Sequence, residues 1–351
     1  MHWKERISME NNMSSLLVGT VVKKALRSIK EDPERCVRNL VDMALQFSAG
    51  RFQKRFFTAA QTMLQNENSG YYNLIRHSVV NADTDHLYTF GMNLGYNGCT
   101  VGADRIRKNE AKLGCRIPWT IILQLDPKQY ASHVHEYHTL IRDGEALGIY
   151  TWMIFAQQQP ETVLSLAAAH PDSAFVLFCE PEDVSSAFLD HATEIQNLMI
   201  TVRYDEETSD IICASLRDMG LLYSVWYQYD SPDAEQIVSG DLFCSAQQLH
   251  PIFTTLVPNP ECTDEVQQRV YQTVQEARSD QRYCTIPLEL VQDNCLIDSI
   301  ISDDVCSVYF DKDGNLYNGN GKLCRFHQNL FKRALADILL SAYPSDSESV
   351  N

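Results

Sequence analysis

The sequence lacks the features that mark several large protein classes. It has no run of about 18 consecutive apolar residues, so it predicts no membrane-spanning helix. Lys and Arg together number 29 against 46 Asp and Glu, which gives a formal net charge of −17. Binding to nucleic acid or to an anionic membrane needs clustered positive charge, so this balance argues against both partners. Residues 1–12 are polar and lack the apolar core of a secretory signal, and we expect a cytoplasmic protein.

Common motifs of catalysis and cofactor binding are also missing. The chain has no Gly-x-Gly-x2-Gly dinucleotide fingerprint, no P-loop and no Gly-x-Ser-x-Gly nucleophile elbow. Its eleven cysteines are scattered and contain no Cys-x2-Cys pair. This usage fits a reducing compartment better than a disulfide framework. The composition, 44% hydrophobic and 21% charged over 351 residues, is that of a globular protein with a large core.

Residues 1–85 predict a helical N-terminal domain. Apolar residues recur at helical spacing in 16–29 and 37–45, and Asp32-Pro33 resembles an N-cap followed by proline at the first helical position. Two further helices are expected at 52–64 and 71–80. Such a domain could dock a partner or cover the floor of the following domain, and we favour the covering role.

Residues 86–294 alternate between apolar runs and helical patterns. The expected strands are 87–94, 119–125, 148–155, 174–179, 198–202, 221–227, 252–256 and 284–290. The expected helices are 104–112, 130–146, 160–169, 184–194, 209–219 and 263–278. Nearly continuous apolar strands are typical of parallel sheets covered by helices. The fold class is therefore α/β, and a (β/α) barrel, full or partial, is favoured over a flat doubly wound sheet.

The remaining chain predicts a small α+β extension over residues 295–343. Segments 305–310 and 315–317 flank Asp311-Lys312-Asp313-Gly314, which predicts a β-hairpin turn. The same four residues lack the later ligands of a calcium loop. A helix is expected at 326–341, and residues 344–351 are expected to be disordered.

Two segments resemble the motifs of one family. Met92-Asn93-Leu94-Gly95-Tyr96-Asn97-Gly98-Cys99, which follows the first expected strand, has the spacing Cys-x3-Cys-x2-Cys of the radical S-adenosylmethionine family, with cysteine kept only at Cys99. Gln124-Leu125-Asp126-Pro127, after the next strand, is similar to the Gly-Gly-Glu-Pro segment of the same family. The order and spacing of elements over about residues 86–260 also resemble this family.

The resemblance implies a radical-SAM-type barrel that binds S-adenosylmethionine through an iron–sulfur cluster. A four-iron cluster needs thiolate ligands, and a thioether or a phenol is a poor replacement. We therefore expect that the [4Fe–4S] cluster and the radical chemistry are lost, that Cys99 is a small buried apolar residue, and that S-adenosylmethionine is still a ligand to consider. The expected cofactor pocket is lined by Met92, Asn93, Tyr96, Asn97, Cys99, Gln124, Asp126 and Arg203.

Polar residues at the ends of the expected strands supply a second set of candidates. Functional groups of a barrel belong at the carboxyl ends of its strands. This reasoning selects Asn93, Asn97, Gln124, Asp126, Gln157, Glu180, Arg203, Asp205, Gln228, Asp230 and Asn259. Strand ends are also polar simply because they meet water. Candidate acids and bases within this set are Asp126, Glu180 and Asp205.

Two groups of residues are weaker candidates for metal binding. His133, His135 and His138 lie on one expected helix, and His135 and His138 share a face; a solvated helix face is the favoured interpretation. Cys295, Cys306, Cys324 and His327 form a late set whose separations are not those of a metal site. We therefore expect no metal at either group.

Three functions follow from these patterns. The favoured hypothesis is a radical-SAM-like barrel without radical chemistry that binds a small molecule or a protein partner. The first alternative is a barrel enzyme with carboxylate acid and base residues. The second is an active radical enzyme with atypical cluster ligands, which would require Cys99 to meet distant partners.

Overall fold

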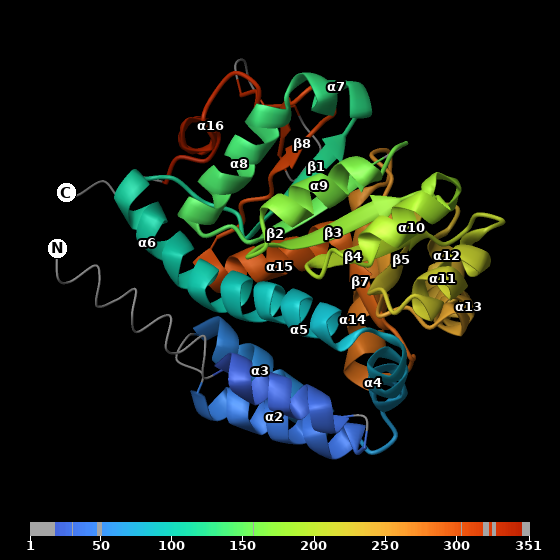
Figure 1. Ribbon diagram of the computed structural model, residues 1–351. Coiled ribbons are helices and arrows are strands. Elements are labelled where there is room, and N and C mark those ends of the chain that lie inside the picture. The colour runs from blue at the N-terminus through green and yellow to red at the C-terminus, as the bar shows by residue number, and fades with distance from the viewer. Residues whose placement is uncertain are drawn as a thin grey trace.

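The computed structural model describes residues 18–29, 31–47, 51–156, 158–302, 304–318, 323–324 and 328–345. Its centre is a nine-stranded sheet with the order β7-β6-β5-β4-β3-β2-β1-β8-β9 (Figure 1). The strands are β1 (Thr120–Leu125), β2 (Thr151–Ala156), β3 (Ala174–Cys179), β4 (Leu198–Arg203), β5 (Tyr223–Tyr229), β6 (Phe253–Pro258), β7 (Ile286–Glu289), β8 (Tyr309–Phe310) and β9 (Leu316–Tyr317). Every neighbouring pair is parallel except β8 and β9.

The strand order decides between the expected architectures. β1 to β7 follow one another in sequence order without the reversal that defines a doubly wound sheet, so that alternative is wrong. β7 and β9 are the two edges and do not pair with each other, so the described sheet is open rather than a closed barrel. The partial barrel among the sequence predictions matches this topology.

Helices cover the outer face of the sheet. The connecting helices are α7 (Pro127–Ser132), α8 (Val134–Leu147), α9 (Glu161–Ala169), α10 (Ser186–Ala192), α11 (Ser209–Asp218), α12 (Ala234–Ser239), α13 (Asp241–Ala246) and α14 (Asp264–Asp280), with the short 3-10 turns η2 (Pro181–Asp183) and η3 (Gln247–Leu249). Alternate strand residues such as Trp152, Phe175 and Val225 are fully buried beneath these helices. The expected helix 130–146 is divided at His133 into α7 and α8.

The other face of the sheet is covered in two parts. Near the amino ends of the strands, Phe90 of helix α5 (Thr84–Gly91) packs with Ala174, Met199 and Leu222. Further along, Leu290 of helix α15 (Leu290–Ser302) packs on an aromatic and aliphatic cluster of strand residues. What remains open on this face is therefore the edge formed by the carboxyl ends of the strands.

The expected first strand, 87–94, is wrong. These residues belong to one continuous helical rod built from α5, the π-helix η1 (Met92–Gly102) and α6 (Ala103–Leu113) (Figure 1). Asp83 begins the rod, because its carboxylate accepts the amides of Asp85 and His86. Gly114 ends it in the left-handed conformation at φ 71°. The motif that resembles the cluster-binding loop thus lies in a helix and follows no strand.

Glycine lets the end of the π-helix approach Gly148, the residue that ends α8. A Cβ atom added to Gly102 would lie too close to the carbonyl oxygen of Gly148 and 2.8 Å from that of Asn97. Gly102→Ala should therefore lower the free energy of unfolding by about 1–2 kcal/mol through local overpacking. Urea unfolding followed by circular dichroism measures this change.

Gly95, in the same π-helix, is the matched control. A Cβ atom added there would meet nothing within 4 Å. Gly95→Ala should leave stability unchanged or raise it by up to about 1 kcal/mol, because alanine loses less backbone entropy in a helix. Equal destabilisation by the two substitutions would contradict the close approach at Gly102.

The N-terminal helices lie against the rod. They are helical residues 18–29, α2 (Pro33–Phe47), α3 (Arg51–Met63) and α4 (Gly70–Asn81). α3 contacts both η1 and α15, and Gly70 donates its amide to the Gln281 carbonyl oxygen at 2.9 Å. This contact fits the covering role better than a free docking module.

The C-terminal segment joins the main sheet. β8 pairs in parallel with β1, and the turn at Asp311–Gly314 connects it to β9 as expected. Helix α16 (Leu335–Ala342) is shorter than the expected 326–341, whose first two residues lie outside the described part of the chain. Pro344 bridges to Cys115 where we expected disorder; residues 346–351 are not described. The domain limits given above remain predictions.

No helix among the described residues has both the length and the apolar character needed to cross a membrane.

Candidate functional site

An aromatic floor lies on the open face near the carboxyl ends of β2, β3 and β5. Phe155 and Phe178 stack with ring centroids 4.3 Å apart, and Trp226 meets Phe155 edge to face at 5.7 Å. Parallel register between β2 and β3 places Phe155 directly opposite Phe178. Phe178 and Trp226 are buried, whereas Phe155 is only half-buried. Because Leu290 also packs on this cluster, Phe155 is the ring of the floor that keeps a partly exposed surface for a planar group.

Arg203, at the end of β4, lies above this floor and is surrounded by acids. Its guanidinium is 5.4 Å from the Trp226 ring centroid. It bonds Asp205 through two nitrogen atoms at 2.9 and 3.4 Å. It also lies 3.5 Å from a Glu180 oxygen and 3.7 Å from a Glu206 oxygen. Because three carboxylates surround one guanidinium, this corner of the site has a net negative charge.

Glu180 is the half-buried acid beside Arg203. Its side chain is 18% exposed, and burial raises its pKa although the neighbouring Arg203 opposes that rise. Asp205 is exposed and serves chiefly as the bidentate partner of Arg203. A carboxyl group with a raised pKa beside a strand end is chemically suited to hold and donate a proton.

Gln124 and Asp126 lie at the same edge with different roles. Gln124 accepts a hydrogen bond from the Tyr309 hydroxyl at 2.9 Å, which fixes its amide beside the floor. Asp126 is the N-cap of α7, because its carboxylate accepts the amides of Lys128 and Gln129, both at 3.0 Å. Asp126 is therefore accounted for as a helix cap.

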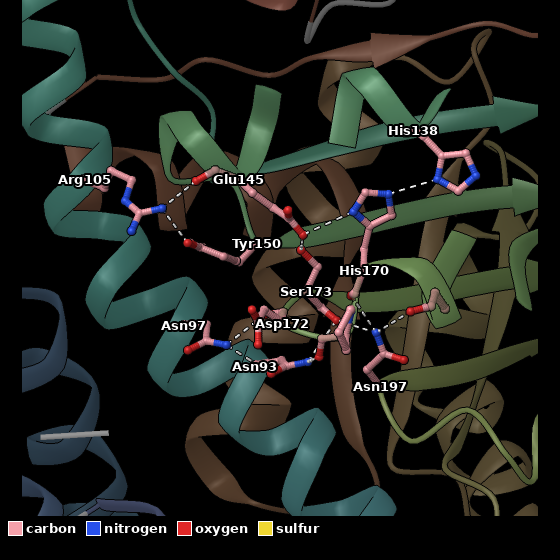
Figure 2. Close-up of polar contacts among 12 residues, drawn as sticks. Asn93, Asn97, Arg105, His138, Glu145, Tyr150, His170, Asp172, Ser173 and Asn197 are labelled. Atoms are coloured by element: carbon pink, nitrogen blue, oxygen red, sulfur yellow. Dashed lines mark hydrogen bonds and ion pairs between the residues drawn. The ribbon is translucent and has the colours of Figure 1, made fainter. Parts of the chain in front are cut away.

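The residues of the expected cluster motif lie at the opposite edge of the sheet. Asn93 donates to the carbonyl oxygens of Pro171 and Ser173, at 2.7 and 3.0 Å, just before β3 begins. Asn97 donates to the Asp172 carbonyl oxygen at 2.8 Å (Figure 2). These two amides satisfy the carbonyl groups of the turn between α9 and β3. The structure therefore separates the predicted pocket into two sets at opposite ends of the strands.

The same edge is poorly suited to an iron–sulfur cluster. Met92, Tyr96 and Cys99 all lie on η1, and only one of them is a thiol. Cys99 is half-buried rather than buried as expected, and it is the single thiol of the three, whereas a four-iron cluster is held by three or four thiolates. These residues do not fit the cluster, and we derive no chemistry through it.

The late cysteine set does not assemble a metal site in the described part of the chain. Cys306 is buried, Cys295 and Cys324 are half-buried, and His327 lies outside the described residues. Among the residues that can be placed, no group of three or more His, Cys, Asp or Glu side chains is arranged to hold a metal ion.

The remaining strand-end predictions serve mainly in turns. The Asp230 amide bonds the Asp233 carboxylate at 3.0 Å, and Asn259 accepts the Glu261 amide at 3.2 Å. Gln228 is half-buried on the open face, and Gln157 is not described.

Sequence reasoning missed a fully buried carboxyl group at the end of β7. Glu289 accepts the Tyr229 hydroxyl at 3.0 Å and the amide of Gln292, while Asp293 accepts the Glu289 amide at 2.9 Å. Together the two carboxylates accept amides at the start of α15, in an arrangement similar to a capping box but with the second acid one residue later. Burial raises the pKa of Glu289 to about 7. Its signal in the sequence was the pair Glu289 and Asp293, four residues apart at the start of an apolar helical run.

No protein-family model and no curated protein matches the sequence. Among solved structures, the chain is similar to Streptococcus suis SuiB bound to S-adenosylmethionine, with a TM-score of 0.47 and 9% identity over 67% of each chain. SuiB bound to its precursor peptide SuiA gives 0.48 and 8% over 67% of this chain and 68% of SuiB. A third SuiB structure gives 0.47 and 9% over 91% and 81%. At these TM-scores the likeness carries no argument, so the function rests on this chain's own residues.

Proposed function

We propose that this protein binds a cationic small molecule of the S-adenosylmethionine type at the carboxyl edge of its sheet and performs no radical chemistry there. Such a ligand combines a planar adenine, a sulfonium, an amino group and a carboxylate. Each of these groups has a complementary partner among the side chains at this edge. The observation that carries the proposal is the aromatic floor beneath a corner with three acids and one arginine.

The floor and the acids would recognise different parts of the ligand. Stacking of a base on an aromatic ring is worth about 1–3 kcal/mol, and Phe155 has the accessible ring. Positive charge is attracted both by aromatic faces and by the acids around Arg203. The guanidinium itself is a partner for the ligand carboxylate, in exchange for one of its present acids.

Calorimetry with S-adenosylmethionine tests the proposal directly. Phe155→Ala should weaken binding by about 5-fold to 150-fold, the range that corresponds to the loss of one stacked base. Glu180→Gln should weaken binding of S-adenosylmethionine more than that of S-adenosylhomocysteine, which lacks the sulfonium charge. Glu182→Gln, an exposed carboxylate two residues further on, is the matched control and should leave affinity unchanged.

Two outcomes would contradict the proposal. One is the absence of measurable binding by the wild-type protein. The other is a loss of binding in Tyr96→Phe with none in Phe155→Ala, which would place the ligand at the amino edge, on the π-helix.

Acid–base catalysis by Glu180 is a second candidate function. The raised pKa of this carboxyl group at a strand end favours it. Mass spectrometry of S-adenosylmethionine incubated with the protein tests this function for that ligand. Conversion by the wild-type protein but not by Glu180→Gln would support catalysis, and quantitative recovery of the ligand would contradict it.

A further inference from the structure

The junction between β7 and α15 contains no loop. Glu289 is the last residue of β7, and Leu290 is the first residue of α15. The Leu290 side chain is 7% exposed and packs on the aromatic floor, in contact with the cluster that contains Phe178 and Trp226. The first turn of α15 therefore covers this part of the floor. Because Glu289 and Leu290 are adjacent in the chain, a displacement of one also displaces the other.

The Glu289 carboxyl group is held at this junction without a cation. It is fully buried, and it accepts the Tyr229 hydroxyl of β5 at 3.0 Å and the Gln292 amide of α15 at 2.6 Å. Arg278 of α14 lies in the same cluster, but its guanidinium pairs with Asp293 at 2.7 Å. Among the residues that the structure describes, no ion pair includes Glu289. A charged carboxylate at this position would therefore lack both water and an opposite charge.

The other titratable groups that face Glu289 add no positive charge. Tyr271 of α14 donates its hydroxyl to Asp293 at 3.2 Å. Cys262, before α14, and Cys295, on α15, lie close enough for the charge of Glu289 to contribute to a raised pKa of each thiol. Burial is the largest influence on the pKa of Glu289 and raises it to about 7, against the opposing hydrogen bonds described above.

We propose that the first turn of α15 is a lid on the aromatic floor and that loss of the proton from Glu289 releases this lid. The charged carboxylate regains water only when the junction moves outward, and Leu290 then leaves the floor with it. The closed position is favoured fully below about pH 4.5, and this advantage is lost as the pH rises through about 7. The lid does not depend on which molecule binds at the floor.

Hydrogen–deuterium exchange of the full-length protein, followed by mass spectrometry and corrected for the pH dependence of free amides, tests the lid. The opening equilibrium of residues 289–296 should rise about 30-fold between about pH 5.5 and about pH 8.5, as expected for a carboxyl group whose pKa is about 7 when closed and about 4.5 when open. Glu289→Gln is neutral at both pH values and should abolish the rise. Glu276→Gln, which changes an exposed carboxylate on α14, is the control and should keep it.

The amides of β3 provide the reference for global unfolding, because a core strand exchanges only when the whole domain opens. At the higher pH the start of α15 should exchange faster than β3. Equal opening of the two segments would show that α15 has no local motion and would overturn the proposal. A rise that persists in Glu289→Gln would assign the titration to another group and would overturn it as well.

A second variant keeps the test available if Glu289→Gln does not fold. Tyr229→Phe retains the aromatic ring but removes the hydroxyl that stabilises the charged carboxylate. It should make the rise in opening with pH larger than in the wild type. A smaller rise in this variant would contradict control of the lid by Glu289.

Discussion

Replacing Asn197 by alanine should lower the free energy of unfolding by about 3 kcal/mol. The Asn197 amide is 4% exposed and lies 2.9–3.0 Å from the carbonyl oxygens of Ala167, His170 and Ser173. Each of these carbonyl oxygens also accepts one other hydrogen bond, from the amides of His170 and Ser173 and from the Asn93 side chain. The loss therefore comes from the three bonds of the buried Asn197 amide, each worth about 0.5–1.5 kcal/mol. Chemical denaturation at neutral pH measures the loss.

The neighbouring Gln196 provides the control for Asn197. Gln196 is exposed, and its side-chain oxygen accepts a hydrogen bond from the Thr89 hydroxyl at 3.1 Å. Gln196→Ala should change stability by no more than about 0.5 kcal/mol, as is usual for surface positions. A loss in Asn197→Ala no larger than this would show that water or other donors replace the amide.

Glu289→Gln should make the free energy of unfolding less dependent on pH, because the wild-type protein loses stability as Glu289 loses its proton. The pKa of Glu289 is raised to about 7 by burial, against a usual value of 4.5. In the folded state this carboxyl group holds its proton to higher pH than in the unfolded chain. Its contribution to stability is therefore full below about pH 4.5 and is lost as the pH rises through about 7. Relative to the wild type, the glutamine variant should gain about 2 kcal/mol between about pH 5.5 and about pH 8.5.

A second variant tests the cause of the shift at Glu289. Tyr229 donates its hydroxyl to this carboxylate, which lowers the pKa and partly offsets burial. Tyr229→Phe should therefore raise the pKa of Glu289 further and make the loss of stability with rising pH steeper. Urea unfolding at a series of pH values gives both slopes. Parallel stability curves for the wild type and Glu289→Gln would contradict a raised pKa at this position.

The strands β1 to β7 were largely predicted by the sequence. The expected segment 174–179 coincides with β3, and 119–125 differs from β1 by one residue. Strands buried on both faces are continuous apolar runs, which a local pattern reveals without knowledge of the rest of the chain. Their alternation with helical segments then implies parallel pairing, because parallel neighbours need a crossover.

The segment 87–94 was misread because its apolar residues fit two periods. Leu87, Phe90 and Leu94 are spaced by three and four residues, which is helical spacing, yet the run is also apolar enough for a buried strand. The capping residue Asp83, just before it, was the local signal for a helix. At the end of Met92–Gly102, the backbone of Gly102 lies close to the distant carbonyl of Gly148, and that contact is not visible in the sequence.

Part of the candidate site was likewise predicted from the sequence, and part of it was visible only in the structure. The sequence predicted that Gln124, Glu180, Arg203 and Asp205 share one edge because the carboxyl ends of parallel strands lie together, and their part in binding stays a prediction. The aromatic floor was not found, since Phe155 and Trp226 appear as ordinary apolar strand residues. The packing of the helical rod places Asn93 and Asn97 at the opposite edge of the sheet.

By itself, the sequence determined the class of fold, the direction of its main strands and the acidic character of the strand-end edge. Only the tertiary structure decided which residues meet: the stacked rings beneath Arg203, the Leu290 side chain that packs on them, and the amides that satisfy the α9–β3 turn. The physical reason is the range of the forces involved. Periodicity and capping act within a few residues, whereas these contacts join segments that are far apart in the chain and are fixed by packing of the whole core.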